Sequence, residues 1–271
     1  DPTDDSISDV AETAAVAISG VSGADATESG TQSVTITIND NESTPTITLT
    51  VSATSIAENA GSSLTLTATS SIVSGSDITV SLGTASTATE GTDYGTVSDI
   101  TISAGATTGT TTFTPTDDSM YETSTNETAI ISIDSVSGGS AAENGTQAVT
   151  ITITENESAP TVTLAVSATS IAENAGSSLT LTATLSGTTS QDVTVALSSS
   201  SSATEGTDYG TVSYITITSG STTGTASFTP TDDSLYDAAS NETAIIAISG
   251  VSGGGATESG TQAVTITITD N

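Results

Sequence analysis

The chain has 271 residues, of which 32 are acidic, and contains no Lys, Arg or His, so its formal net charge is −32. This charge excludes nucleic acids and anionic membrane surfaces as partners, because both are bound through Lys and Arg. No run of about 18 apolar residues predicts membrane insertion, and the absence of Cys excludes disulfides as a means of stabilising small domains.

Residues 1–42 contain an acidic cluster, TDDSISD at 3–9, and resemble only the second half of the sequence that follows. We therefore expect them to form the C-terminal half of a domain whose first four strands are missing. The chain begins with Asp-Pro rather than Met, which is typical of a segment taken from a longer array.

Residues 43–157 contain seven runs in which apolar and polar residues alternate with period two, as in half-buried β-strands. Gly, Ser, Asn and Asp cluster between the runs. Seven strands in about 115 residues predict an all-β, seven-stranded sandwich of the Ig-like Greek-key type. The runs are 44–53, 63–69, 77–83, 97–103, 110–116, 128–136 and 147–155. The expected core residues are Tyr94, Ile102, Phe113, Ile130, Val149 and Ile151.

Residues 158–271 repeat the same unit, and VSATSIAENAGSSLTLTAT occurs unchanged at 51–69 and 166–184. Glu58 and Glu173 are 115 residues apart, and Asn41 and Asn156 have the same separation. A period of this length is too long for a solenoid and fits a linear string of small domains. The predicted domains are 1–42, 43–157 and 158–271.

The acidic cluster recurs as TDDSMYE at 116–122 and TDDSLYD at 231–237. No basic side chain exists to neutralise these carboxylates, so we expect a cation from solution to do so. Ca²⁺ takes six to eight oxygen ligands, whereas the ligands of softer metals, Cys and His, are absent. Adjacent residues on a strand point to opposite faces, so Asp117 and Asp118 reach one cluster only from a loop.

Four motifs in constant order resemble those of the Calx-beta domain family. They are AENAG (57–61, 172–176), EGTDY (90–94, 205–209), the TDDS-x-Y cluster, and the closing TITENE (152–157) or TITDN (267–271). The resemblance covers the whole chain and implies seven-stranded sandwiches, some of which bind calcium through loops at one end. It also implies tandem copies in large extracellular surface proteins.

The resemblance implies a ligand set for each repeat, in which Met120 and Leu235 would contribute backbone carbonyls and all other members carboxylates. The first complete domain would use Glu58, Asp93, Asp117, Asp118, Met120, Glu122, Glu155 and Glu157. The second would use Glu173, Asp208, Asp232, Asp233, Leu235, Asp237 and Asp270. The partial domain would use Asp4, Asp5, Asp9, Asp40 and Glu42. The roles of Glu127 and Glu242 stay open, and isolated acids such as Asp77, Glu143 and Glu258 are expected to be solvated charges.

We expect a non-enzymatic extracellular protein, a stalk or filament of a cell surface or biofilm matrix that Ca²⁺ makes rigid. Its partners would be calcium ions and neighbouring copies of the same domain, which could self-assemble into a filament. Two alternatives stay open: an adhesin module that binds a carbohydrate or protein directly, and a Ca²⁺-sensing regulatory module. Paired carboxylates also serve glycosidases, but no aromatic platform for sugar accompanies them, and we expect no catalytic residues.

Overall fold

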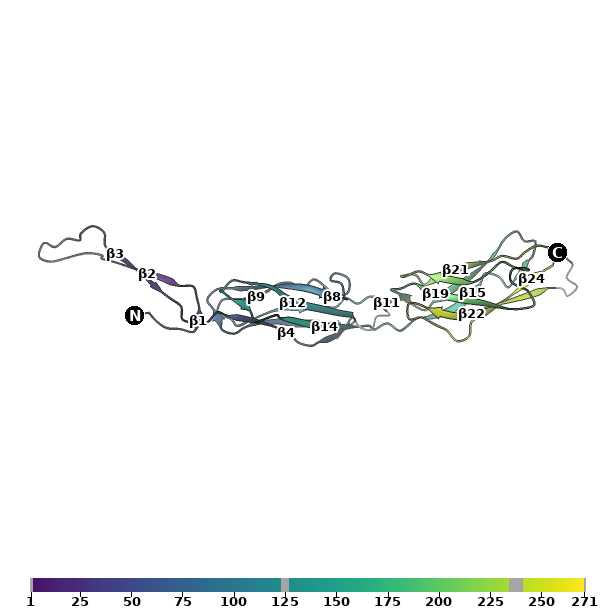
Figure 1. The fold of residues 1–271 in the computed structure, drawn as a ribbon, viewed down its shortest axis with the longest axis horizontal. Coiled ribbons are helices and arrows are strands. Elements are labelled where there is room, and N and C mark those ends of the chain that lie inside the picture. The colour runs from purple at the N-terminus through teal and green to yellow at the C-terminus, as the bar shows by residue number, and fades with distance from the viewer. Residues whose placement is uncertain (1, 123–126, 234–240, 271) are drawn as a thin grey trace. The chain divides into compact units, whose positions relative to one another are not determined.

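The computed structural model describes residues 2–122, 127–233 and 241–270, and the chain divides into two compact units (Figure 1). The first unit consists of residues 1–117 and 126–154, and the second of residues 118–125 and 155–271. The described regular structure is all β-strand. In that part of the chain, no helix is long and apolar enough to cross a membrane.

The first unit contains a sandwich of two sheets, with strand orders β10-β6-β4-β13 and β5-β14-β12-β8-β9. The strands are β4 (Thr46–Val51), β5 (Ser55–Ala57), β6 (Leu64–Ser70), β8 (Ile78–Ser86), β9 (Ile100–Ile102), β10 (Thr108–Phe113), β12 (Glu127–Ser137), β13 (Ala142–Glu143) and β14 (Ala148–Thr154). Seven of them coincide with the seven predicted runs, so the predicted all-β sandwich is confirmed. The short strands β5 and β13 were not predicted.

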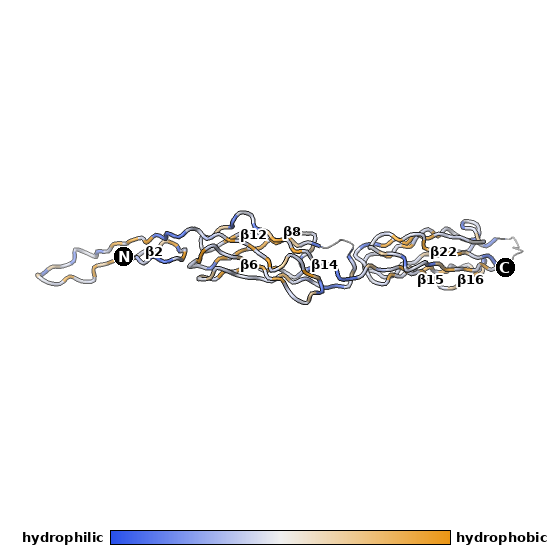
Figure 2. The backbone as a smooth tube through the Cα atoms, turned by 90° about the horizontal axis from the view of Figure 1, so that it is seen from below, coloured by the Kyte–Doolittle hydropathy of each residue, from blue (hydrophilic) through white to orange (hydrophobic). Residues whose placement is uncertain are grey.

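Alternation places apolar side chains between the two sheets. Along β6, Leu64, Leu66 and Ala68 are buried while Thr65 is exposed, and Figure 2 shows apolar stretches recurring along the strands of the sandwich. The rings of Tyr94 and Phe113 stack at a centroid distance of 4.7 Å. Each large side chain buried in this way contributes about 1.5–3 kcal/mol.

The prediction that Ile130 belongs to the core is wrong, because it is 37% exposed. Its neighbours Ala129 and Ile131 are completely buried. Successive residues of a strand face opposite sides of the sheet, so of two consecutive isoleucines only one can point inward. Val149 is partly buried and packs against the core rather than within it, whereas the other predicted core residues are buried.

The second unit repeats this sandwich, with strand orders β21-β17-β15-β23 and β16-β24-β22-β19-β20. Its stacked ring pair is Tyr209 and Phe228, again with centroids 4.7 Å apart. The strands are β15 (Thr161–Val166), β16 (Ser170–Ala172), β17 (Leu179–Leu185), β19 (Val193–Ser201), β20 (Tyr214–Ile217), β21 (Thr223–Phe228), β22 (Glu242–Ser252), β23 (Thr257–Glu258) and β24 (Ala263–Thr269).

Residues 2–42 form a hairpin of β2 (Glu12–Ala17) and β3 (Ser33–Ile38). Glu12 pairs with Ile38, in the same register in which Glu127 of β12 pairs with Ile153 of β14. The hairpin therefore has the local structure of the β12–β14 pair.

Two short parallel pairs complete the described strands. In the first unit β1 (Ile7–Ser8) pairs with β7 (Val73–Ser74). In the second unit β11 (Met120–Tyr121) pairs with β18 (Thr188–Thr189). Both β1 and β11 lie inside the acidic TDDS-x-x motif, where the sequence predicted a loop.

Candidate metal centre

Backbone pairing places acidic residues from distant parts of a repeat at the same end of the sandwich. β5 runs parallel to β14, and beyond their last paired residues the N–H of Glu58 donates to the carbonyl of Thr154 at 3.2 Å. Glu58 therefore lies beside Glu155, the residue that follows Thr154. In the second unit the N–H of Glu173 donates to Thr269 at 3.1 Å, which places Glu173 beside Asp270.

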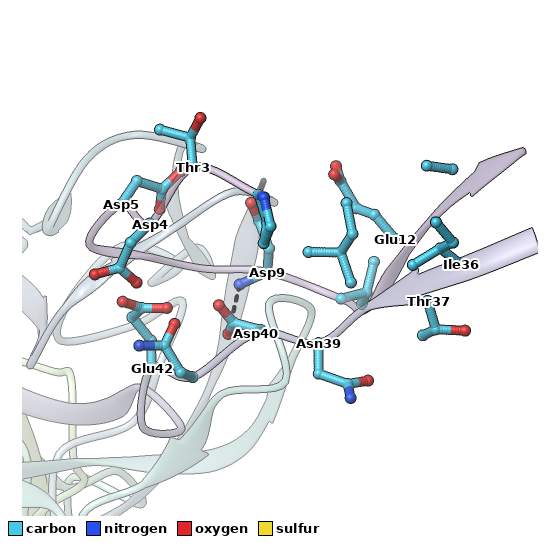
Figure 3. Close-up of a pocket in the computed structure, with 15 residues that line it drawn as sticks. Thr3, Asp4, Asp5, Asp9, Glu12, Ile36, Thr37, Asn39, Asp40 and Glu42 are labelled. Carbon is cyan, nitrogen blue, oxygen red and sulfur yellow. Dashed lines mark hydrogen bonds between the residues drawn. The ribbon is translucent and has the colours of Figure 1, made fainter. Parts of the chain in front are cut away.

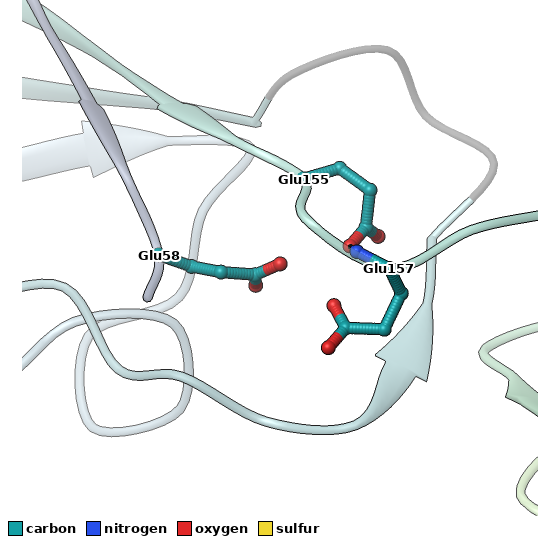
Figure 4. A group of neighbouring side chains, drawn as sticks. All are labelled: Glu58, Glu155 and Glu157. Carbon is teal, nitrogen blue, oxygen red and sulfur yellow. Dashed lines mark hydrogen bonds between the residues drawn. The ribbon is translucent and has the colours of Figure 1, made fainter. Parts of the chain in front are cut away.

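Three carboxylates of the first complete repeat come together (Figure 4). Glu58, Glu155 and Glu157 each offer an oxygen, and these oxygens lie within 4.8 Å of one another. Glu58 is only 7% exposed, which is unusual for a carboxylate in a chain without basic side chains. The N–H of Glu122 also donates to Oε2 of Glu155 at 2.6 Å, so the acidic segment reaches the same residue.

Asp93 is joined to the start of the acidic segment through the backbone. Its carbonyl accepts the N–H of Thr116 at 2.9 Å, and its Oδ2 accepts the N–H of Thr89 at 2.5 Å. Asp118 Oδ1 accepts the N–H of Met120 at 2.6 Å, so this side chain bonds to the backbone where β11 begins. Asp117 and Asp118 are exposed, and neither they nor Asp93 belong to the group of three carboxylates.

The second complete repeat has a pocket lined by predicted ligands from four separate segments. Glu173, Asp208, Asp233 and Asp270 line it together with Asn241 and Glu242. Its free space is about 10 Å³, which is close to the volume that one water molecule requires. The pocket therefore matches a single small ion or water in size.

The remaining predicted ligands of this repeat are placed differently. Asp232 lines an adjoining pocket of about 200 Å³ that also includes Glu173. The two adjacent aspartates thus face different spaces, although both are next to Glu173. Leu235 and Asp237 lie outside the described residues.

All five acids predicted for the partial domain line one pocket of about 650 Å³ (Figure 3). They are Asp4, Asp5, Asp9, Asp40 and Glu42. The N–H of Asp9 donates to Oδ2 of Asp40 at 3.0 Å. This contact is the counterpart of the Glu122–Glu155 contact in the next repeat, and Asp5 likewise accepts the N–H of Ile7 at 2.8 Å as Asp118 accepts that of Met120.

The carboxyl groups of Asp40 and Glu42 share a hydrogen bond that moves their pKa values apart. This bond is the largest cause that raises the pKa of Glu42 above its ordinary 4.5, and the charges of Asp40 and Asp4 raise it further. The same bond is the largest cause that lowers the pKa of Asp40 below its ordinary 3.8. Two neighbouring carboxylates without a cationic partner repel each other when both are charged, so one of them keeps its proton to a higher pH.

Two pocket residues had no ligand role in the sequence analysis, which left Glu242 open and did not consider Glu12. Glu242 lines the pocket of the second repeat and Glu12 lines the pocket of the partial domain. Both begin a strand, β22 and β2, and both precede Thr-Ala in the sequence. This recurring Glu-Thr-Ala was the available signal. Asn241, just before Glu242, has a φ of 77°, a left-handed conformation that Asn tolerates better than most residues.

The donor set is chemically suited to a hard cation. Every titratable side chain in these pockets is a carboxylate, and the sequence contains no nitrogen or sulfur ligand from His or Cys. Oxygen-only sites of this kind select Ca²⁺ or Mg²⁺, and a flexible ring of several carboxylates favours the larger ion.

Comparisons with known proteins agree with the sequence motifs. A family model described as the Calx-beta domain matches residues 40–157 and 155–271, and both matches include the acidic motifs of a complete repeat. A comparison with curated proteins gives no match.

Several solved structures are similar to the chain. The segment CBD12 of CALX1.2 is 14% identical, with a TM-score of 0.34, over 73% of this chain and 77% of that one. The apo form of the Calx CBD1 domain is 17% identical, with a TM-score of 0.34, over 41% and 98%. The adhesin InvE of Yersinia pseudotuberculosis is 16% identical, with a TM-score of 0.32, over 83% and 58%.

Proposed function

The chain belongs to the Calx-beta family, and from this premise we propose that it is a non-enzymatic structural protein whose acidic clusters bind Ca²⁺. The observation that carries the proposal is the pocket of the second repeat. Five carboxylates from separate segments line it, namely Glu173, Asp208, Asp233, Glu242 and Asp270. No basic side chain exists in the sequence to neutralise them.

Equivalent groups would bind Ca²⁺ in the other repeats. In the first complete repeat they are Glu58, Glu155 and Glu157, with Glu122 held against Glu155. In the partial domain they are Asp4, Asp9, Asp40 and Glu42, with Glu12. A bound cation would neutralise the carboxylates at these places and would hold together strand ends that otherwise repel one another.

We further propose that residues 1–42, 43–157 and 158–271 are repeats of an extracellular stalk. Glu155 and Glu157 immediately precede and enter the linker NESAPT at 156–161, so neutralising them would restrict the chain where one repeat leads into the next. Sites with the modest affinity of extracellular Ca²⁺-binding modules, with a Kd of about 10⁻⁴–10⁻³ M, would be occupied at millimolar Ca²⁺. A chain without Lys or Arg also offers no cleavage site to trypsin-like proteases.

The test is thermal unfolding of the whole chain in EDTA, in about 2 mM Ca²⁺ and in about 2 mM Mg²⁺. We expect Ca²⁺ to stabilise the folded state by about 2 kcal/mol per site, from mass action at a Kd near 10⁻⁴ M, and Mg²⁺ to have a smaller effect.

The matched variants are Asp208→Asn with Asp233→Asn, which remove two pocket carboxylates, and Asp134→Asn, which removes one exposed charge of β12. Only the double variant should lose part of the Ca²⁺ effect. Coincident unfolding curves in all three solutions would show that the clusters are solvated charges and that the proposed function is wrong.

A further inference from the structure

The two short parallel strand pairs occupy equivalent positions in successive repeats. In the first unit Ile7 pairs with Val73 and Ser8 with Ser74. In the second unit Met120 pairs with Thr188 and Tyr121 with Thr189. The receiving residues Val73 and Thr188 are one period of 115 residues apart. The donated residues hold the same place in the TDDS-x-x motif, so the same pairing has formed twice.

The hydrogen bonds of the two pairs are also equivalent. The N–H of Gly75 donates to the carbonyl of Ser8 at 3.1 Å, and the N–H of Ser190 donates to the carbonyl of Tyr121 at 3.1 Å. In the second unit the hydroxyl of Thr188 adds a bond of 2.9 Å to the carbonyl of Ser119. None of these contacts uses a carboxylate.

The receiving strands are held in place by their own sandwiches. The carbonyl of Ser74 accepts the N–H of Gly105 at 2.9 Å, and that of Thr189 accepts the N–H of Gly220 at 3.0 Å. Ser74 and Thr189 are 2% and 1% exposed. Each receiving strand is therefore fixed to its own sandwich by a backbone hydrogen bond, and it pairs with the donated segment through its other backbone groups.

Close approach is visible at Gly75. A Cβ atom at this position would lie 1.8 Å from Oδ1 of Asp9, so the donated segment occupies space that any other residue would fill. Ser190 takes the equivalent position in the second unit, where Glu122 replaces Asp9. A larger residue at position 75 would therefore require the Asp9 side chain to move, and the second pair has serine at this position.

We propose that the TDDS-x-x segment of each repeat is a strand that is donated to the receiving edge of the repeat that follows. Residues 118–125 indeed belong to the compact unit of residues 155–271 rather than to that of residues 1–117. Adding a strand to an exposed edge is a general mode of recognition that relies on backbone hydrogen bonds. Such bonds suit repeats that all carry negative charge, because opposite charges are not available to join them.

This donation goes beyond the proposed function, since the contacts that carry it are hydrogen bonds of the backbone and of a threonine hydroxyl rather than of carboxylates. The partner of each segment is the next repeat of the same chain, recognised at residues 73–75 or 188–190. The acidic motif therefore has two roles, one through its backbone and one through its carboxylates.

The test is disulfide formation in the whole chain, which contains no cysteine of its own. Met120→Cys with Thr188→Cys, and Ile7→Cys with Val73→Cys, introduce pairs at register partners. Neighbouring strands lie about 4.8 Å apart, within the Cα separation that a disulfide spans. The control is Met120→Cys with Thr180→Cys, which places the second cysteine on the exposed side of β17.

In EDTA we expect both register pairs to oxidise at least about tenfold faster than the control pair, because a formed strand pair raises the effective concentration of the thiols. Rates equal to that of the control, or cross-linking that occurs only with Ca²⁺, would overturn the proposal. If Ca²⁺ leaves the unfolding curve unchanged while both register pairs still oxidise quickly in EDTA, the proposed function fails and the donation stands.

A second measurement is amide exchange in the unmodified chain. In EDTA, exchange at Gly75 and Ser190 should be about tenfold slower than at an exposed loop amide, corresponding to the usual net strength of one hydrogen bond.

Variants of Ser190 test the same hydrogen bond. Ser190→Pro removes the donor, whereas Ser190→Ala keeps it, so only the proline variant should slow disulfide formation between residues 120 and 188. Fast exchange at both amides would contradict the proposal.

Discussion

Some acidic side chains in this protein accept hydrogen bonds from backbone N–H groups. Asp77 Oδ1 accepts the N–H of Ala104 at 2.8 Å, and Glu143 and Glu258 each accept the N–H of a glutamine four residues later, at 2.5 Å. Sequence reasoning treated these three acids as solvated charges and missed this role. The two Glu–Gln bonds are local and close loops, whereas the Asp77 bond and the pocket acids join segments that are distant in the sequence.

Glu242, whose role the sequence analysis left open, provides a direct prediction. Glu242→Gln should weaken Ca²⁺ binding to the second repeat by about tenfold, because one of five carboxylates in the pocket loses its charge. Binding is measured by calorimetry, and Asp134→Asn is the charge-matched control. Unchanged affinity in the glutamine variant would show that Glu242 only lines the pocket.

The Asp40–Glu42 pair makes a second prediction at this scale. Without Ca²⁺, Glu42 should titrate above 4.5 and Asp40 below 3.8, because they share a hydrogen bond. The stabilisation that Glu42 contributes to the folded state is fully present below pH 4.5 and is lost as the pH rises through its raised pKa. The stabilisation that Asp40 contributes is fully present above pH 3.8 and is lost as the pH falls through its lowered pKa.

Side-chain carboxyl chemical shifts followed by NMR through this pH range measure both values. Asp40→Asn removes the largest cause of the shift, so the pKa of Glu42 should fall in that variant. A Glu42 titration that is the same with and without Asp40 would contradict the shared bond.

Close packing between strands depends on glycine at one position of each sandwich. A Cβ atom on Gly224 of β21 would lie 2.3 Å from the carbonyl oxygen of Thr216 in β20, and Gly109 of β10 has the same contact with Thr101. Backbone atoms cannot move aside as side chains do, so overpacking here displaces a strand.

We expect Gly224→Ala to destabilise the second sandwich by about 1–3 kcal/mol, measured by denaturant unfolding. Gly210→Ala is the control, because a Cβ atom there would meet only Thr229 O at 3.9 Å. Equal stability of the two variants would mean that β20 and β21 separate at little cost.

Across the whole molecule, a formal charge of −32 with no positive side chain opposes compaction through self-repulsion. Two apolar cores, each built around a stacked Tyr–Phe pair, provide the main opposing term. The balance between the two depends on the ions in solution.

Raising NaCl to about 1 M in EDTA should therefore raise the unfolding temperature, because the Debye length falls to about 3 Å. In saturating Ca²⁺ the same addition should have a smaller effect, since the clusters are already neutralised. Scanning calorimetry at several salt concentrations measures both. A salt response that is equal with and without Ca²⁺ would show that repulsion is not concentrated in the clusters.

The sequence alone determined the strand pattern and the repeat. Period-two alternation and the exact recurrence of motifs carry this information locally, because each strand needs one apolar face and each copy folds in the same way. The acidic motifs also predicted which segments would approach one another, and Glu173, Asp208, Asp233 and Asp270 do line one pocket.

Only the tertiary structure decided which of two neighbouring residues faces inward, as at Ile130 and at the Asp232–Asp233 pair. Strand register and turn geometry set these directions, and neither is visible in composition. The same holds for the short strand inside the acidic motif. Pairing of Met120 and Tyr121 with Thr188 and Thr189 joins residues almost 70 positions apart, and no local pattern in the sequence specifies a pairing at this separation.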